Sequence, residues 1–96
     1  MKESHLRKML AQELDAEVVT SCDEGGHRRF KSRKTGKWGY CTHEGTVVQK
    51  PQFDAAEHFN TATNTYDVIE DGHPRLYDPD WSNSWSPEQY AGFRAF

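Results

Sequence analysis

The feature that most constrains the fold is the stretch KTGKWGYCTHEG at residues 34–45, where short runs of strand-forming residues are separated by glycines. Thr35-Gly36 and Glu44-Gly45 have the composition of tight turns. Residues 38–42, between them, have the length of an ordinary strand. Short strands joined by such turns pair with their sequence neighbours in antiparallel hairpins. The stretch therefore predicts the middle of an antiparallel meander.

Alternation along residues 38–42 puts Trp38 and Tyr40 on one face of that strand and Gly39 and Cys41 on the other. We expect the Trp and Tyr rings to lie on the core side. Because Gly39 has no side chain, we expect a ring or another strand to approach the backbone closely there.

The whole chain, residues 1–96, is expected to form a single small domain of the α+β class. An apolar stripe predicts a helix over residues 4–16, and it consists of Leu6, Met9, Leu10 and Leu14. Strand-forming runs over residues 18–78 predict a small antiparallel β-sheet, a meander of about five to six strands. Residues 81–96 are an aromatic tail that ends in a short helix.

Three local signals set the expected element boundaries. Pro51 is expected to end a strand, because proline has no backbone N–H to give to a sheet. Asp54 and Glu57 have the spacing of a capping box, which predicts a short helical turn after it. Ser86, with a proline directly after it and Gln89 three residues on, predicts the start of the C-terminal helix.

Residues 36–59, GKWGYCTHEGTVVQKPQFDAAEHF, resemble one unit of the bacterial WG β-repeat. The order of that unit is matched at Gly36, Lys37, Trp38, Gly39, Tyr40, Gly45, Val47, Val48, Pro51, Phe53, Asp54, Ala56 and Phe59. Residues 71–78, DGHPRLYD, are similar to a degenerate second unit, with Pro74 and Arg75 in place of Trp and Gly. The resemblance implies a β-rich binding or scaffold unit without shared catalytic residues. A single repeat needs neighbours to cover its faces.

Charge is distributed unevenly along the chain. Residues 1–53 hold ten Lys/Arg and seven Asp/Glu, whereas residues 54–96 hold two Arg and eight acids. A basic cluster makes a candidate nucleic-acid-binding hairpin of Arg28, Arg29, Lys31, Arg33, Lys34 and Lys37. The other interpretation is a solvated strand face whose long basic side chains prevent edge pairing. The net charge of −3 favours this second interpretation.

The tail combines many rings with the acidic character of the second half of the chain. We predict a partner-binding surface there, made of Trp81, Trp85, Tyr90, Phe93, Phe96, Asp67, Glu70, Asp71, Asp78 and Asp80. In the alternative interpretation, the five rings are core residues that close the open side of the sheet. Both interpretations stay open, because the rest of the chain has little apolar surface for five rings to cover.

No common catalytic motif is present, so we expect no enzymatic activity, no catalytic residues, no cofactor and no metal. Cys22, His27, Cys41 and His43 are the set that a sheet would bring together as zinc ligands, but their spacings are unusual for zinc. A Cys41 nucleophile paired with His27 or His58 lacks an orienting acid and an oxyanion site.

These features indicate a function class rather than a partner. The low hydrophobic content of 34% and the aromatic content of 12% predict a thin core of large rings. We expect a non-enzymatic protein-binding module, a compact inhibitor or adaptor of bacterial or phage origin such as an anti-CRISPR. Its partner is another protein, or a second copy in a homodimer. Nucleic acid is the alternative partner.

The expected location follows from the cysteines and the N-terminal pattern. Two cysteines are too few for a disulfide scaffold, and the charged N-terminus does not have the pattern of a signal peptide. No apolar run is long enough to predict a membrane-spanning helix. We therefore expect a cytoplasmic protein with no membrane contact, located in the host cell cytoplasm if a phage encodes it.

Overall fold

The computed structural model of the protein describes residues 2–94, with side chains described as far as Tyr90. The strands of this region form two antiparallel sheets. The first sheet has the strand order β1-β2-β3-β4 and the second sheet has the order β5-β6-β7-β8. In chain order the elements are α1 (Glu3–Glu13), β1 (Ala16–Val19), β2 (His27–Ser32), β3 (Trp38–Thr42), β4 (Val47–Phe53), β5 (Ala55–Asn60), β6 (Thr65–Glu70), β7 (His73–Tyr77), β8 (Ser84–Trp85) and α2 (Pro87–Arg94).

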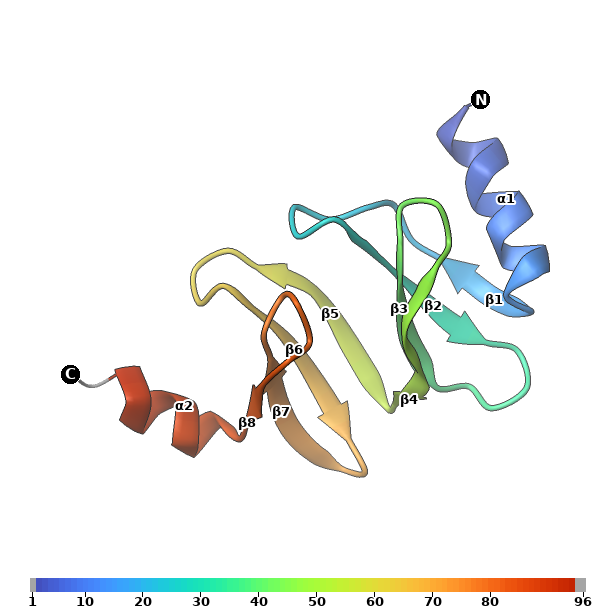
Figure 1. Ribbon diagram of the computed structural model, residues 1–96. Helices are drawn as coiled ribbons and strands as arrows, with labels where there is room; N and C mark the ends of the chain where they lie inside the picture. The colour runs from blue at the N-terminus through green and yellow to red at the C-terminus, as the bar shows by residue number, and fades with distance from the viewer. Residues whose placement is uncertain (1, 95–96) are drawn as a thin grey trace.

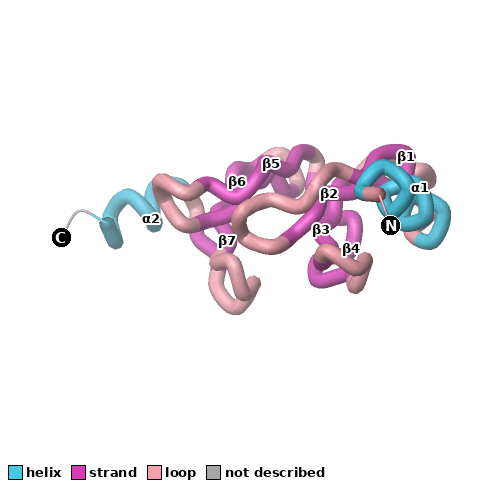
Figure 2. Tube along the Cα trace, turned by 90° about the horizontal axis from the view of Figure 1, so that it is seen from above, coloured by secondary structure: helices cyan, strands magenta, loops and turns pink. Residues whose placement is uncertain are grey.

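The two sheets follow one another along an elongated molecule with extents of 45 × 26 × 17 Å. α1 lies beside β1 at one end, and α2 extends from the second sheet at the other end (Figure 1). The view turned by 90° shows the same separation of the two helices (Figure 2). Strands that follow one another in the chain pair in each sheet, so both sheets are simple meanders.

The α+β class, the antiparallel pairing and the two terminal helices are confirmed, but the prediction of one sheet with five to six strands is wrong. Pro51 does not end its strand, because it lies in a bulged part of the edge strand β4, where a missing N–H breaks no regular ladder. The first helix ends at Glu13, before the predicted residue 16, because Asp15 turns the chain into β1 with a φ of 51°.

The predicted helical turn after Asp54 is also wrong, because residues 55–60 form β5. The Asp54 carboxylate does not cap a helix. Instead it pairs with Lys37 and accepts a hydrogen bond from the backbone N–H of Gly72, 2.9 Å away. Ala56 enters the core from the strand. Asp54 therefore links the turns of both sheets at the point where the chain passes from one sheet to the other.

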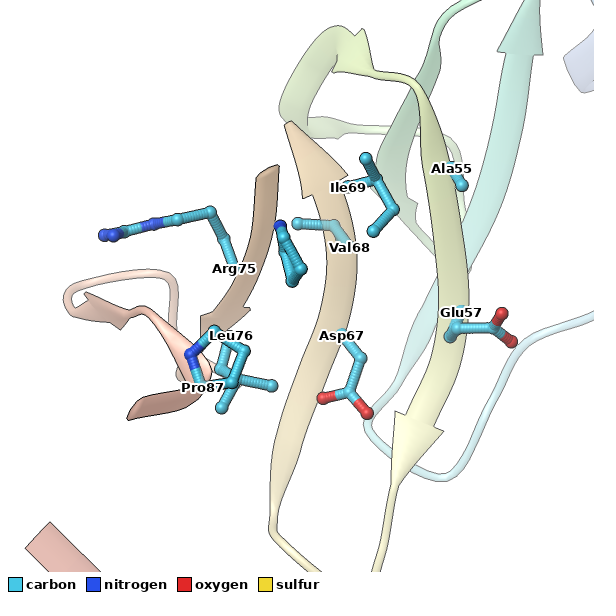
Figure 3. Close-up of a pocket in the computed structure, with 9 residues that line it drawn as sticks. Ala55, Glu57, Asp67, Val68, Ile69, Arg75, Leu76 and Pro87 are labelled. Atoms are coloured by element: carbon cyan, nitrogen blue, oxygen red, sulfur yellow. The ribbon is translucent and has the colours of Figure 1, made fainter. Parts of the chain in front are cut away.

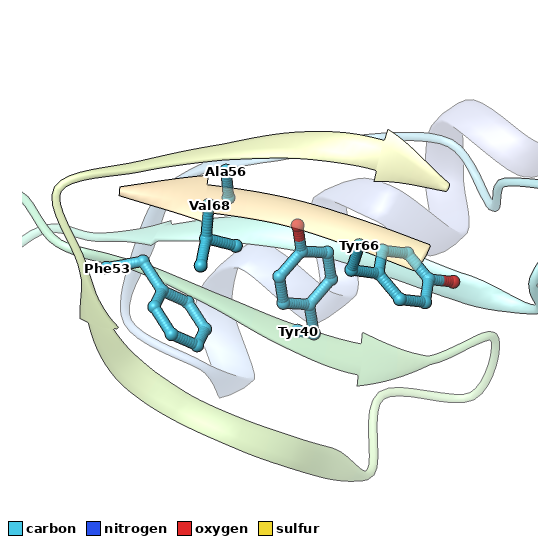
Figure 4. Packing of buried hydrophobic residues seen from close by; sticks show 5 residues of the cluster. All are labelled: Tyr40, Phe53, Ala56, Tyr66 and Val68. Carbon is cyan, nitrogen blue, oxygen red and sulfur yellow. The ribbon is translucent and has the colours of Figure 1, made fainter. Parts of the chain in front are cut away.

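The inner faces of the two sheets share an aromatic core. Tyr40 and Phe53 of the first sheet pack with Ala56, Tyr66 and Val68 of the second sheet, and none of these residues is more than 7% exposed. Figure 4 shows the three rings side by side, with the two aliphatic side chains next to them. The ring centroids of Tyr40 and Tyr66 are 4.9 Å apart in an edge-to-face arrangement, which aromatic pairs favour. The prediction that Tyr40 lies on the core side is confirmed.

The outer face of the first sheet is covered in part by α1, through Leu10 and Glu3. Phe30, Cys41 and Ala16 form a buried cluster there, and Leu14 packs against it. Leu10 of α1 is 2% exposed and fills the space over the turn between β3 and β4. This face is therefore a second, smaller core.

Gly39 lies on the same covered face. A Cβ atom at this position would be 2.5 Å from the backbone oxygen of Gln49 and 2.8 Å from Cζ of Phe30. The predicted close approach at Gly39 is confirmed, and both a strand and a ring use the space.

Candidate functional site

The outer face of the second sheet carries an open groove. Strand register places Ala55 beside Ile69, and Ile69 beside Pro74, and cross-strand neighbours of this kind share a face. Leu76 continues the row next to Trp85 of β8. The groove has a volume of about 280 Å³ and is lined by Ala55, Glu57, Asp67, Val68, Ile69, Pro74, Arg75, Leu76 and Pro87 (Figure 3).

Three charged side chains, Glu57, Asp67 and Arg75, line the rim of the groove. The Glu57 side chain is exposed. The Asp67 carboxylate accepts hydrogen bonds from Thr65 Oγ1 at 2.9 Å and from Asn60 Nδ2 at 3.0 Å. Arg75 points away from the groove floor in Figure 3, and its guanidinium donates to Ser84 Oγ at 2.6 Å. The rim therefore carries two carboxylates, of which Glu57 is exposed, and one guanidinium that is turned away from the groove floor.

The helix α2 supplies one wall of the groove through Pro87. The predicted start of this helix is confirmed, because the Ser86 N–H donates to Gln89 Oε1 at 2.9 Å and the Gln89 N–H donates to Ser86 Oγ at 3.2 Å. Tyr90 donates from its hydroxyl to the backbone oxygen of Thr63 at 2.6 Å. This bond holds the first turn of the helix to the second sheet.

Of the predicted partner-binding rings, Trp81 lies against the shared core. Its ring stacks on Tyr66 with centroids 4.7 Å apart and also contacts Tyr40 at 4.7 Å. Trp85 and Tyr90 lie next to each other, with ring centroids 5.8 Å apart, and both are half-buried near the groove. The side chain of Phe93 and the whole of Phe96 lie outside the described residues.

The predicted acidic residues mostly shape turns. Glu70 accepts a hydrogen bond from the Tyr77 hydroxyl at 2.6 Å, and Asp71 takes a positive φ of 53° in the turn between β6 and β7. Asp78 accepts from Asn83 Nδ2 at 2.9 Å. Asp80 accepts from the Ser82 backbone N–H at 3.1 Å and from its hydroxyl, and these bonds lower the pKa of Asp80. Among the predicted acids, only Asp67 lines the groove.

The basic cluster does not form one exposed surface, and the placement of Arg28 in it is wrong. The Arg28 side chain is 0% exposed and donates to both carboxylate oxygens of Glu3, at 2.7 and 2.9 Å. It also donates to the backbone oxygens of Thr20 and His43 and to His43 Nδ1. The hydrogen bonds with Arg28 lower the pKa of Glu3. Arg28 therefore fixes α1 to the first sheet.

Most other basic side chains of the cluster have partners within the described chain. Arg29 points to the opposite face and donates to the backbone oxygen of Ala56 at 2.9 Å. The remaining ion pairs join Lys31 to Glu17, Arg33 to Asp15 and Lys37 to Asp54. Lys34 is exposed. The cluster is thus divided between two faces of the sheet and largely used for internal contacts.

The four candidate zinc ligands are not gathered. Within residues 2–94, no group of three or more His, Cys, Asp or Glu side chains has the arrangement of a metal site. Cys41 is buried, which raises the pKa of its thiol to about 11. His43 faces Arg28, and Cys22 is a free, half-buried thiol. A high thiol pKa leaves little nucleophilic thiolate at Cys41 at neutral pH.

The groove residues Ile69, Pro74 and Leu76 were not among the predicted site residues. A signal for them exists in the sequence: the pairs Val68-Ile69 and Leu76-Tyr77 place two apolar residues in succession within short strands. Successive residues point to opposite faces, so such pairs indicate a sheet that is apolar on both sides.

The structure also joins Asp23, His27, Tyr66 and Trp81 across the two sheets, which no local pattern indicates. Asp23 Oδ1 accepts hydrogen bonds from the Tyr66 hydroxyl at 2.8 Å and from the His27 backbone N–H at 3.1 Å. These residues come from three distant segments, and only the tertiary fold brings them together.

None of the described helices is both long enough and apolar enough to cross a membrane. Comparisons of the chain with protein-family models, with curated proteins and with solved structures gave no match in any of the three.

Proposed function

We propose that the protein is a non-enzymatic protein-binding module, a compact inhibitor or adaptor, and that the outer face of the second sheet is its contact surface. The observation that carries this proposal is the open groove formed by β5, β6, β7 and Pro87. Leaving an apolar face in water is unfavourable, and a partner that covers it gains the free energy of burial.

The chemistry of the groove favours an amphipathic helix with lysine or arginine beside its apolar stripe. Its apolar side chains Ile69, Pro74 and Leu76 suit leucine-sized side chains, and the rim carboxylates of Glu57 and Asp67 attract cations. The surrounding residues 54–96 hold eight acids against two Arg, so the wider surface has the same preference. Within the chain itself, α1 covers the outer face of the first sheet in a comparable way.

The test is binding of a synthetic amphipathic helix of leucine and lysine, about 15 residues long so that it has a helical tendency of its own. Isothermal titration calorimetry measures its affinity for the unmodified chain and for Leu76→Asp. A buried carboxylate on the groove floor is unfavourable, so we expect a loss of about tenfold or more, or about 1.4 kcal/mol. Val47→Asp is the matched control, because Val47 is an apolar residue of the first sheet that is 44% exposed.

Equal affinities for the unmodified chain and for Leu76→Asp would overturn the proposal, as would an equal loss in the control. The sequence also suggests a second copy of the chain as the partner that covers the groove. Light scattering tests for such a dimer by measuring the molar mass in solution. A dimer that Leu76→Asp converts to a monomer would mean that this face joins two copies and not a foreign helix.

The proposal includes the cytoplasm as the place of action. Cys22 and Cys41 are free thiols, and such thiols persist in a reducing compartment.

A further inference from the structure

Four side chains form a continuous hydrogen-bonded chain between the two sheets. The indole Nε1 of Trp81 lies 3.4 Å from Nε2 of His27, and Nδ1 of His27 lies 2.8 Å from the Tyr66 hydroxyl. The Tyr66 hydroxyl lies 2.8 Å from Oδ1 of Asp23. Asp23 belongs to the loop between β1 and β2, His27 begins β2, Tyr66 lies in β6, and Trp81 belongs to the loop between β7 and β8.

Only one arrangement of protons satisfies every contact in this chain. The indole nitrogen of Trp81 is a donor only, so Nε2 of His27 must accept. A neutral His27 then carries its proton on Nδ1 and donates to the Tyr66 oxygen. Tyr66 in turn donates its own proton to the Asp23 carboxylate. A second proton, on Nε2 of His27, would face the indole N–H with another donor and break the first link.

The surroundings of His27 favour its neutral form. Burial lowers the pKa of His27, and the nearby Asp23 carboxylate and the backbone of Gly25 partly oppose this shift. Burial, together with the bond to Asp23, raises the pKa of Tyr66 well above its usual value, so its hydroxyl keeps its proton at neutral pH.

Further titratable groups from the other packed elements surround this cluster, and each has a partner. Arg29, two residues after His27 in the same strand, donates to the backbone of Ala56 and to His58 of β5. Tyr40 of β3 donates to the backbone oxygen of Glu57, and burial raises its pKa. Tyr77 of β7 donates to Glu70, and burial raises the pKa of Tyr77 to about 12.

The indole ring of Trp81 holds the loop between β7 and β8 against the core. Trp81 has a φ of 65°, a conformation that costs free energy for a large side chain and persists only where packing holds it. The compensating contacts are the ring stack on Tyr66, at 4.7 Å and 17°, and the edge contact with His27, at 5.6 Å. If the indole leaves this site, the backbone strain at Trp81 favours a different loop conformation.

We propose that these residues form a pH-operated latch, in which protonation of His27 at Nε2 expels the Trp81 indole from the core and releases residues 78–86. Above the usual His pKa of 6.5, the neutral ring holds the latch closed. As pH falls below that value, protonation favours the released loop. Pro87, a wall of the groove, follows this segment directly, so release also weakens helix binding, and this last step rests on the proposed function.

The test is NMR on the full chain, with nitrogen-detected imidazole spectra and the Trp81 indole resonance followed from about pH 8 to about pH 5, the range in which histidine titrates. At the upper pH, His27 should be the Nδ1–H tautomer. On acidification, the signals of Trp81 and residues 78–86 should move together with the His27 titration, while Phe30 and Cys41 in the covered face stay unchanged.

Two variants separate the latch from general acid sensitivity. His27→Asn keeps a donor near the Tyr66 hydroxyl but cannot be protonated, so the pH response of Trp81 should disappear. His73→Gln, at an exposed histidine of β7, should leave the response unchanged. If His27→Asn does not fold, Trp81→Phe gives an independent reading: without the indole N–H, His27 should titrate at a higher pH than in the unmodified chain.

An Nε2–H tautomer at neutral pH would overturn the latch, as would a Trp81 signal that ignores the His27 titration or an unchanged titration in Trp81→Phe. The link to the groove is measured separately, as the affinity of the leucine-lysine helix above and below the His27 pKa. A working latch with pH-independent peptide binding would leave the latch in place and remove only its connection to the proposed function.

Discussion

The outer face of the first sheet lies under α1, whereas the outer face of the second sheet carries an open groove of about 280 Å³. The inner faces of both sheets meet in one aromatic core, and both sheets have the same meander order. The second helix does not repeat the arrangement of the first, because α2 extends from the end of the second sheet and, among its described side chains, contributes Pro87 to the groove.

In the proposed function, this difference separates a first sheet that stabilises the fold from a second sheet that binds a partner. The first sheet uses its basic residues internally, with Arg28 buried against Glu3 and Arg29 bonded across to β5. The second sheet leaves acidic side chains at the rim of an apolar face. Substitutions in the covered face should therefore change stability, and matched substitutions in the groove should change binding.

The largest expected effect is on Arg28 of the first sheet. Arg28→Ala leaves the backbone oxygens of Thr20 and His43 without a donor and opens a cavity where a fully buried side chain was, so we expect a loss of about 3–5 kcal/mol in the free energy of unfolding. The matched change in the second sheet, Arg75→Ala, removes a half-exposed contact with Ser84 and should cost about 1 kcal/mol or less. Urea denaturation measures both. Similar losses for the two variants would contradict the assignment of Arg28 as the residue that fixes α1.

A leucine from each outer face gives the next comparison. Leu10 is 2% exposed, so Leu10→Ala should destabilise the fold by about 2–4 kcal/mol. Leu76 is half-buried on the open face, so Leu76→Ala should cost less than about 1.5 kcal/mol and mainly weaken binding of the leucine-lysine helix. Thermal unfolding and calorimetric titration, run on the same samples, check the two expectations. A Leu76→Ala variant as unstable as Leu10→Ala would mean that the groove floor is core.

Substituting one glycine in each sheet by alanine compares two causes of lost stability, steric crowding and backbone strain. Gly39→Ala adds a methyl group 2.5 Å from the oxygen of Gln49, so we expect a loss of about 1–3 kcal/mol through overpacking. Gly72→Ala meets no atom within 4 Å but has a φ of 78°, which costs about 1–2 kcal/mol for a residue with a side chain. A high-resolution structure of each variant would show the difference. β4 should move in the first variant, and only the turn should adjust in the second.

The smallest expected effects concern acid, and they should occur at different pH values between the two sheets, where Trp81 packs, and at α1. The pKa of His27 is lowered on folding, so its contribution to stability is complete above about 6.5 and is lost as pH falls through the unfolded value towards the folded one. The pKa of Glu3 is also lowered, so the contact with Arg28 persists until pH falls below its usual 4.5. NMR signals of Trp81 should therefore change before those of α1. Simultaneous changes would indicate general unfolding.

Local patterns predicted the parts of the fold that depend on local chemistry. The glycine turns around residues 34–45, the strand at residues 38–42 and the capped start of α2 at Ser86 follow from short-range rules. The strand β5 was missed because Pro51 and the Asp54 capping pattern suggested a strand end and a helical turn there, whereas the edge position of β4 and the packing of Ala56 in the core decided the conformation. Tertiary context outweighed local preference at those residues.

The candidate site was only partly predictable for a related reason. The tail rings and Asp67 were selected by composition, but strand register decides that Ile69 and Leu76 share one face with Asp67, and the ring stack on Tyr66 turns Trp81 inward. The buried position of Arg28 depends on Glu3, 25 residues earlier in the chain. The WG β-repeat remains a resemblance in residues 36–59, and the structure adds that this stretch runs from β3 through β5 and so connects both sheets.

The most direct test of the central comparison is to map where the leucine-lysine helix binds on the unmodified chain, by backbone amide chemical shifts in an NMR titration. We predict that the shifts concentrate on residues 55–57, 67–69 and 75–76 and at the start of α2, and that α1 and residues 28–30 stay unchanged. Shifts centred on α1 and the first sheet, or saturable binding that leaves the groove residues unchanged, would contradict the claim that the second sheet carries the binding face.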